Sequence, residues 1–404
     1  MVQSVKNYLS NTKIAQKYNV SNPTVGEWIR NAVENKNNIK VELVKSKYRI
    51  LDTEHNDAEL TRLSQHAKRY KGSDNRKVVK VSKEFYEIFS EEQIIEIINS
   101  LQSYKILPVK YTFVDEGAIF WDKFIAEQNK NKNYKTLSLC ETLLQQTRTY
   151  INYRTENKKI NIIDIGQGNC YPIKETIEYF IKENKLNSYI AIDISQKILE
   201  IAEKNIKTWF PELEVKTYCM DVEKDSISKV CFENKTENVS NVICYLGGNV
   251  GNLEEKIPVY YNFKQSISEN DFIIIDNVLD NIKDNTNFSY MNRLSYRWKQ
   301  DIFIPKILGI DVDNAEVEYE YNKDNNSRSE YLVLDKDYEL HFEVLGKKIK
   351  LELFKGDKIC VWRHHRSIYK KEINVLDSMS LYSSYSIIDK THSWVSWVCE
   401  NNKI

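Results

Sequence analysis

Short apolar runs alternate with amphipathic stretches through the middle of the chain. The first run, Ile160–Ile165, is rich in isoleucine and leads directly into Gly166-Gln167-Gly168. A β-branched run that ends in glycines predicts a buried parallel strand feeding a tight turn. The next stretch has apolar residues at helical spacing, namely Ile173, Ile177, Phe180 and Ile181. This spacing predicts that a helix follows the turn.

The same alternation continues along the chain. Further apolar runs predict strands over 188–193, 214–219, 241–246 and 272–276, and helical spacing predicts helices over 196–210 and 254–267. We therefore expect an α/β fold with a doubly wound, Rossmann-like sheet. Asp193 and Asp221 follow the second and third strands, and a second glycine cluster at 247–251 follows the fourth.

Charge divides the chain unevenly. The 404 residues contain 58 Lys and Arg against 58 Asp and Glu, so the formal net charge is zero. Residues 1–80 nevertheless contain 16 basic and 8 acidic residues, a net charge of +8, which leaves −8 for residues 81–404. This asymmetry predicts a basic module joined to an acidic body. In the body we expect the core of alternating strands and helices at about 130–276, plus C-terminal strands.

The basic module has the pattern of two short helices. Ile14 and Ala15 face inward in the first, Tyr18-Asn19 forms the turn, and Val25 and Trp28 recur at helical spacing in the second. The pattern resembles a helix-turn-helix of the MerR/excisionase kind, with a wing strand over 45–50 and a closing helix over 57–70. The resemblance implies DNA contacts from the second helix and the wing. These would come from Ser21, Asn22, Thr24, Arg30 and Lys47.

A helical packing or dimerisation module with a solvated basic face would have the same pattern. Modules of this kind often work as dimers, so a homodimer is one expectation, although no heptad helix is evident. The seven cysteines are irregularly spaced, which favours reduced thiols and a cytoplasmic protein. The first residues lack the apolar stretch of a signal peptide, and no run is long enough to span a membrane.

Acids and glycines at the predicted strand ends indicate a nucleotide-like ligand, because ligands of such sheets bind outside the carboxyl ends of the strands. The Gly166-Gln167-Gly168 turn lacks the third glycine of a dinucleotide fingerprint, which favours S-adenosylmethionine over NAD. The expected chemistry is in-line transfer of the sulfonium methyl group, which depends on positioning. No zinc-like set of ligands is present, so no metal is expected.

Four motifs in the body resemble one methyltransferase family. They are Leu107–Gly117 with Phe120-Trp121-Asp122, Tyr245–Asn252, Arg328–Val333 and Gly356–Ile359. They are similar to segments of the histidine Nα-methyltransferases of ergothioneine biosynthesis, a family that also includes dimethylallyltryptophan N-methyltransferases. The resemblance covers about residues 95–400. It implies a class I methyltransferase sheet that holds the cofactor, and an α+β domain at about 277–375 that covers the substrate.

The resemblance implies roles for particular residues. Asp164, Gly166 and Gly168 would surround the methionine part of the cofactor, Asp193 would bind its ribose, and Asp221 its adenine amine. Gly247 and Asn252 would face an amino-acid substrate, with Asn252 holding one end of it.

Several substrate positions depart from the family pattern. Trp362 and His364 stand where the family has the Glu and Ser that hold histidine, while Phe113 and Tyr331 replace a Tyr and a Met. Losing a hydrogen-bonding acid should discriminate strongly against histidine. We therefore predict that histidine is not the substrate. Three interpretations of His364 remain open: a substrate contact, a proton acceptor, or a structural or surface residue.

Three hypotheses about function follow. The first is an N-methyltransferase for a small amine or amino acid other than histidine, with a DNA-binding module attached. The second is a nucleic-acid methyltransferase, although the chain lacks an amino-methylating [DNS]-P-P-[YWF] motif and a Pro-Cys pair. The third is a transcriptional regulator that senses S-adenosylmethionine through a non-catalytic methyltransferase domain.

Overall fold

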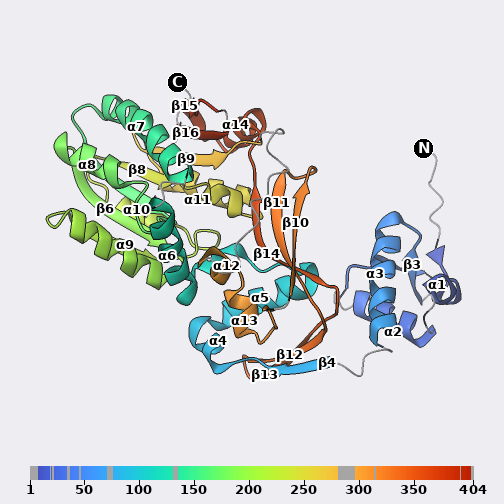
Figure 1. Ribbon diagram of the computed structural model, residues 1–404. Helices are drawn as coiled ribbons and strands as arrows, with labels where there is room; N and C mark the ends of the chain where they lie inside the picture. Colours follow the sequence, from blue (N-terminus) through green and yellow to red (C-terminus); the bar gives the residue numbers. More distant parts are fainter. Residues whose placement is uncertain are drawn as a thin grey trace, which may run out of the picture. The chain divides into compact units, whose positions relative to one another are not determined.

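The computed structural model describes residues 8–18, 20, 22–33, 37–44, 47–70, 76–130, 135–280, 296–313, 315–391 and 393–401 (Figure 1). The chain divides into two compact units. The N-terminal unit comprises Met1–Val79, Lys336–Leu340 and Glu352–Gly356. The main unit comprises Lys80–Asp335, His341–Leu351 and Asp357–Ile404. Among the described helices, none combines the length and the apolar character that a membrane span requires.

The N-terminal unit packs three helices and a small antiparallel sheet around an apolar core. Along the chain it contains β1 (Tyr8–Leu9), α1 (Asn11–Tyr18), α2 (Asn22–Val33), β2 (Val41–Val44), β3 (Lys47–Leu51) and α3 (Glu54–Tyr70), before β4 (Arg76–Lys80). The three short strands pair in the order β1-β3-β2. Ile14, Val25 and Trp28 are buried in the core, as their spacing predicted.

One polar residue fastens the β2–β3 hairpin of this unit to α3. Asn56 is fully buried, and its side chain accepts from the backbone N–H of Lys40 at 2.7 Å and donates to the carbonyl of Leu51 at 2.9 Å. Burying an amide without such partners would be costly, so Asn56 fixes where the hairpin meets the helix. Tyr18 lies within α1 and is buried, so its assignment to the turn was wrong.

The main unit is built on a seven-stranded sheet in the order β15-β16-β9-β8-β5-β6-β7. The strands are β5 (Lys159–Ile165), β6 (Leu186–Asp193), β7 (Val215–Cys219), β8 (Val239–Tyr245), β9 (Phe272–Val278), β15 (Tyr382–Ile388) and β16 (Trp394–Glu400). The first five run parallel. At one side β16 is antiparallel to β9, and the edge strand β15 is antiparallel to β16, so β15 runs in the same direction as the five. The structure therefore confirms the five predicted parallel strands within a mixed sheet.

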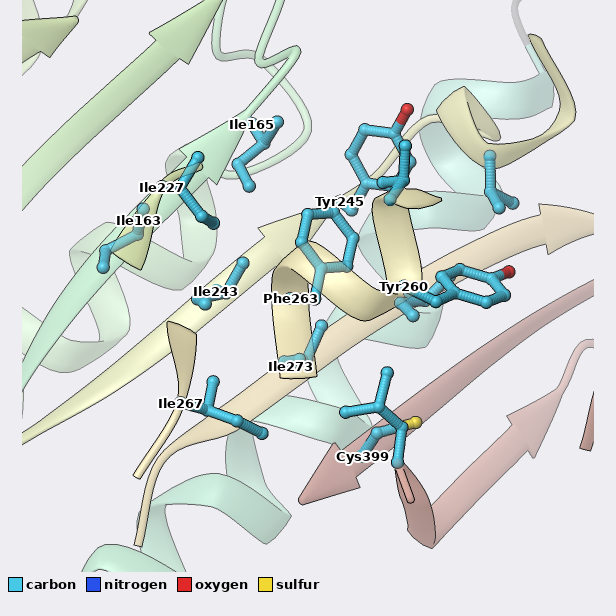
Figure 2. Close-up of a cluster of buried hydrophobic side chains, with 14 of the residues drawn as sticks. Ile163, Ile165, Ile227, Ile243, Tyr245, Tyr260, Phe263, Ile267, Ile273 and Cys399 are labelled. Carbon is cyan, nitrogen blue, oxygen red and sulfur yellow. The ribbon is translucent and has the colours of Figure 1, made fainter. Parts of the chain in front are cut away.

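Alternate residues of the central strands enter two separate cores, because successive side chains of a strand point to opposite faces. Ile163 and Ile165 of β5 belong to the core shown in Figure 2, where Tyr245 of β8 packs edge-on against Phe263 at 5.3 Å between ring centroids. Ile160 and Ile162 enter the opposite core. Both faces are buried, which explains why the strands read as continuous apolar runs.

Helices cover both faces of the sheet. Residues of α7 (Lys135–Thr155), α8 (Lys174–Lys182) and α9 (Gln196–Trp209) join the core on one face. Residues of α10 (Ser228–Glu233), α11 (Lys256–Ser266) and α14 (Tyr369–Ser378) join the other. The sheet is thus doubly wound, as expected.

Further helices and strands lie outside the seven-stranded sheet (Figure 1). They are α4 (Lys83–Ile88), α5 (Glu91–Tyr104), η1 (Val109–Phe113), α6 (Glu116–Lys130), α12 (Tyr296–Asp301), α13 (Phe303–Ile307), β10 (Glu316–Asn322), β11 (Ser327–Val333), β12 (Asp337–Val344), β13 (Lys347–Leu353) and β14 (Lys358–His365). Helices α6 and α12 pack together. The backbone N–H of Leu107 donates to the carbonyl of Cys360 in β14 at 2.9 Å. This hydrogen bond joins a segment that precedes the sheet in the chain to a strand that follows β9.

Two local features differ from the sequence prediction. Ile181 was placed on the apolar stripe of α8 but is 41% exposed, because it lies about 80° around the helix from the line of Ile173, Ile177 and Phe180. Helix α10 was not predicted, since it has only six residues.

Candidate functional site

The turn after β5 forms the first wall of the site. Gly166 and Gly168 have φ of +61° and +56°, a conformation that side chains other than glycine rarely adopt. A Cβ on Gly166 would lie 2.6 Å from Nδ2 of Asn249, which donates to the carbonyl of Gly166 at 2.8 Å. The two glycine clusters predicted from sequence therefore meet in space, and Asn249 joins them.

Asp164 and Asp193 lie at the ends of neighbouring strands β5 and β6. Asp164 accepts a hydrogen bond from the hydroxyl of Tyr189 at 2.8 Å, and Asp193 accepts from the backbone N–H of Ser195 at 2.9 Å. Burial raises the pKa of each carboxyl to about 7. A ligand that donates hydrogen bonds to these groups would favour their ionised forms.

Asp221, which follows β7, is held by a lysine. Nζ of Lys110 lies 2.9 Å from Oδ2 of Asp221 and 3.0 Å from the carboxylate of Glu96. Burial lowers the pKa of Lys110, but the carboxylates of Glu223 and Asp221 more than offset this, so the net shift is upward. Lys110 therefore stays charged and ties η1 to the end of β7.

The loop after β8 lies against Asp276 of β9. Gly247 and Gly248 have φ of +76° and +74°, and the N–H of Gly248 donates to Asp276 at 2.8 Å. The thiol of Cys140 donates to the same carboxylate at 3.3 Å. Burial raises the pKa of Asp276 to about 6. Asp276 thus shapes the loop that leads into η2 (Asn249–Asn252).

His364 of β14 fits closely over this loop. Its Nε2 lies 3.1 Å from the carbonyl oxygen of Gly248, and a carbonyl only accepts, so Nε2 must carry the proton. Burial lowers the pKa of His364 to about 3, so the ring is neutral near pH 7. This arrangement favours a positioning role for His364 over a role as proton acceptor.

These walls enclose one cavity of about 720 Å³. Its lining includes nearly all of the site residues predicted in the main unit: Phe113, Asp164, Gly166, Gly168, Asp193, Asp221, Gly247, Asn252, Trp362 and His364. Tyr331 is the exception: it neighbours Glu330 on β11, and successive side chains of a strand point to opposite faces. The same cavity therefore contains the strand-end acids and the substrate positions that differ from the family pattern.

The cavity also contains residues that sequence reasoning missed. Lys110, Trp121 and Glu330 stood within recognised motifs but were given no role, while Arg297 comes from α12 and belongs to no motif. The ring of Trp362 packs parallel to His364 at 6.1 Å between centroids, and the guanidinium of Arg297 lies 5.4 Å from the centre of the Trp362 ring. In the sequence, the i,i+4 spacing of Arg297 and Asp301 is the pattern that could have predicted an ion pair on one helix face.

The strand-end residues fit S-adenosylmethionine. Carboxylates at the ends of β5, β6 and just after β7 can accept from the ammonium, ribose hydroxyls and adenine amine of this cofactor, respectively. The left-handed Gly166 and Gly168 let the backbone approach it closely.

The residues predicted to contact DNA belong to the N-terminal unit. Asn22 and Arg30 are exposed on α2, and Thr24 is partly exposed. Ser21 lies outside the described residues, and Lys47 starts β3, with its side chain outside the described part.

Comparisons with known proteins agree with the motifs. The family model for "Histidine-specific methyltransferase, SAM-dependent" matches residues 90–366, more than half of the chain. No curated protein matches the chain significantly by sequence.

Solved structures similar to the chain include an S-adenosylmethionine-dependent methyltransferase from Clostridium acetobutylicum, with 11% identity, a TM-score of 0.36, and coverage of 76% of this chain and 98% of that one. Magnesium protoporphyrin IX methyltransferase from Synechocystis PCC 6803 has 9% identity, a TM-score of 0.38, and coverage of 72% and 95%. TM-scores this low support no argument about function. The family match shows that the chain belongs to the histidine-specific, S-adenosylmethionine-dependent methyltransferase family and is an S-adenosylmethionine-dependent methyltransferase.

Proposed function

We propose that the protein methylates the nitrogen of a small amine or amino acid other than histidine. The observation that carries the proposal is the wall of the cavity formed by β14. Trp362 and His364 line the cavity at the two positions where the family has the Glu and Ser that hold histidine. The imidazole therefore loses both partners at those positions, while a flat indole and a neutral ring offer an apolar and aromatic surface.

The reaction needs positioning rather than strong acid–base catalysis. The cofactor supplies an electrophilic methyl group on a sulfonium when it is bound. Asp164 and Asp193 would orient the cofactor, and Asn252 would hold the substrate amine with its lone pair toward that methyl group. The N–C bond forms as the C–S bond breaks, and the amine loses its proton to solvent. Holding the two reactants in line supplies most of the rate enhancement in such a reaction.

A labelled-methyl screen tests this function. The purified protein is incubated with methyl-labelled S-adenosylmethionine and separate pools of amino acids, amines, DNA and RNA. We expect label in small amines or amino acids and none in histidine. Label in histidine, or only in nucleic acid, would contradict the proposal.

The substrate wall itself can be tested by reversal. The double variant Trp362→Glu, His364→Ser restores the family residues at both positions. We expect this variant to gain histidine binding by at least tenfold over the wild type, measured by calorimetry with S-adenosylhomocysteine present. An unchanged affinity for histidine would show that these two positions do not set specificity.

We also propose that the N-terminal unit is a winged helix-turn-helix that binds DNA. Three features support this: the succession of α1, α2, the β2–β3 hairpin and α3, the exposed Asn22 and Arg30 on α2, and the net charge of +8 in residues 1–80. Phosphate contacts would make binding strongly dependent on salt.

Fluorescence anisotropy with labelled duplexes tests this second proposal. Arg30→Ala should weaken binding and reduce the slope of log affinity against log salt by about 1 if Arg30 contacts a phosphate. Lys182→Ala, which removes an exposed lysine of α8 in the main unit, is the matched control. Equal losses in both variants, or no DNA binding by the wild type, would refute the proposal.

A further inference from the structure

Glu330 of β11 is a buried acid that faces the cavity. Its side chain is 1% exposed and lines the cavity wall. In the antiparallel pair of β11 and β14, Glu330 stands directly opposite Trp362, and Arg328 stands opposite His364. Opposed residues share a face of the sheet, so all four side chains line one wall. Arg328 is opposite His364, the residue that contacts Gly248, and Glu330 lies two residues, or about 7 Å, from Arg328 along β11.

One oxygen of Glu330 lacks a partner. Among the described residues, no donor lies within hydrogen-bonding distance of Oε1, although this atom is buried. A buried carboxyl oxygen without a partner is costly, so such an oxygen in a ligand cavity marks a place where a ligand can donate.

The charges around Glu330 point to the chemistry of that donor. Nε of Arg297 lies 3.1 Å from Oδ2 of Asp301, whose side chain is fully buried. Asp301 and Arg297 are also the charged groups that act on Glu330. Two buried carboxyls thus share one guanidinium among the described residues. Burial, together with the charge of Asp301, raises the pKa of Glu330 to about 8, which favours the protonated carboxyl in the free protein near neutral pH.

We propose that Glu330 is a specificity residue that binds a second, protonated nitrogen group of the substrate, distinct from the nitrogen that is methylated. The substrate class is then a diamine or a basic amino acid rather than a neutral one. The ligand cation would replace the proton on Glu330 and pair with the carboxylate. The imidazole of histidine is mostly neutral above its usual pKa of about 6.5 and supplies this charge poorly. The proposal rests on the proposed function, since it names the substrate class of the same site.

Matched ligands that differ only in the distal charge test the proposal. Binding to the full-length protein is measured by calorimetry at pH 7.5 with S-adenosylhomocysteine present. The pairs are lysine against norleucine and 1,5-diaminopentane against pentylamine. We expect the wild type to bind the charged member of at least one pair tenfold or more tightly. Equal affinities within both pairs, or no binding of any of the four ligands, would overturn the proposal.

Variants assign this preference to Glu330. Glu330→Gln should abolish the preference within each pair while leaving the affinity for S-adenosylhomocysteine unchanged, which also reports correct folding. Glu320→Gln, an exposed glutamate of β10 in the same small sheet, is the control and should keep the preference. A preference that survives in Glu330→Gln would overturn the proposal.

If Glu330→Gln does not fold, Glu330→Asp keeps the charge but withdraws it by one methylene, and it should reduce the preference without abolishing it. Failure of the proposed function would look different. The binding preference is measured without methyl transfer, so it can be present even if the labelled-methyl screen finds no transfer to any amine.

Discussion

At the scale of single residues, we expect the buried carboxyls at the strand ends to govern cofactor binding. We predict that Asp193→Asn weakens S-adenosylmethionine binding by tenfold or more, because it removes a charged acceptor for ribose hydroxyls. Burial raises the pKa of Asp193 to about 7 in the free protein, and ribose hydroxyls favour the ionised form. Wild-type affinity should therefore fall as pH decreases from 8 to 6, and the dependence should be smaller in Asp193→Asn.

Calorimetry across this pH range measures both effects. Asp164 and Asp276 retain pKa values raised by burial to about 7 and about 6, so some dependence on pH should persist in the variant. Asp377→Asn, at an exposed position of α14, is the control and should behave as the wild type. Unchanged affinity in Asp193→Asn would place the ribose elsewhere.

Gly251 is predicted to tolerate no side chain. A Cβ there would lie 2.3 Å from the ring of His364 and 2.7 Å from the carbonyl oxygen of His365. Gly251→Ala should therefore destabilise the main unit by about 1–3 kcal/mol and displace His364. Urea unfolding measures the loss.

Two further variants interpret the result at Gly251. Adding His364→Ala should recover part of the lost stability, since the ring clash is removed while the backbone clash stays. Gly26→Ala in α2, where a Cβ meets nothing within 4 Å, should stabilise its helix by about 0.5–1 kcal/mol. Full stability in Gly251→Ala would mean that β14 can move away from η2.

At the scale of elements, β16 contributes side chains to the apolar cores on both faces of the sheet. Trp397 is fully buried in the core on one face of the sheet. We predict that Trp397→Ala lowers the free energy of unfolding by about 3–5 kcal/mol, because it leaves a large cavity. Trp397→Phe should cost clearly less. Urea unfolding followed by far-UV circular dichroism provides the comparison, and equal losses in the two variants would argue against a cavity effect.

The elements that sequence alone predicted share a physical property. Strands such as β5 and β8 are buried on both faces, so their apolar runs are continuous and easily recognised. The strand-end acids and glycines followed from these strands. Glu330 could not be predicted in the same way, because its place opposite Trp362 depends on the register of β11 and β14, which no local pattern specifies. The pairing of Arg297 with Asp301 became informative only once α12 was placed against the cavity.

At the scale of the whole molecule, charge is unevenly distributed along a chain whose formal net charge is zero. Opposite net charges of +8 in residues 1–80 and −8 in the remainder should attract one another between molecules at low ionic strength. We predict self-association near pH 7 that added salt reverses, since exposed charges are screened within about 8 Å at physiological ionic strength. Static light scattering across a salt series measures this, and association that strengthens with salt would instead indicate apolar contacts.

The position of β16 has a consequence for how the protein is made. Its partner strand β9 ends at Val278, and β16 begins at Trp394, so more than a hundred residues separate the two. During synthesis the outer edge of β9 stays unpaired until β16 has left the ribosome. An exposed apolar edge strand is a template for aggregation. Because Trp394 also lines the cavity, the cofactor cannot meet its complete site, and so cannot stabilise the fold, until β16 has been synthesised.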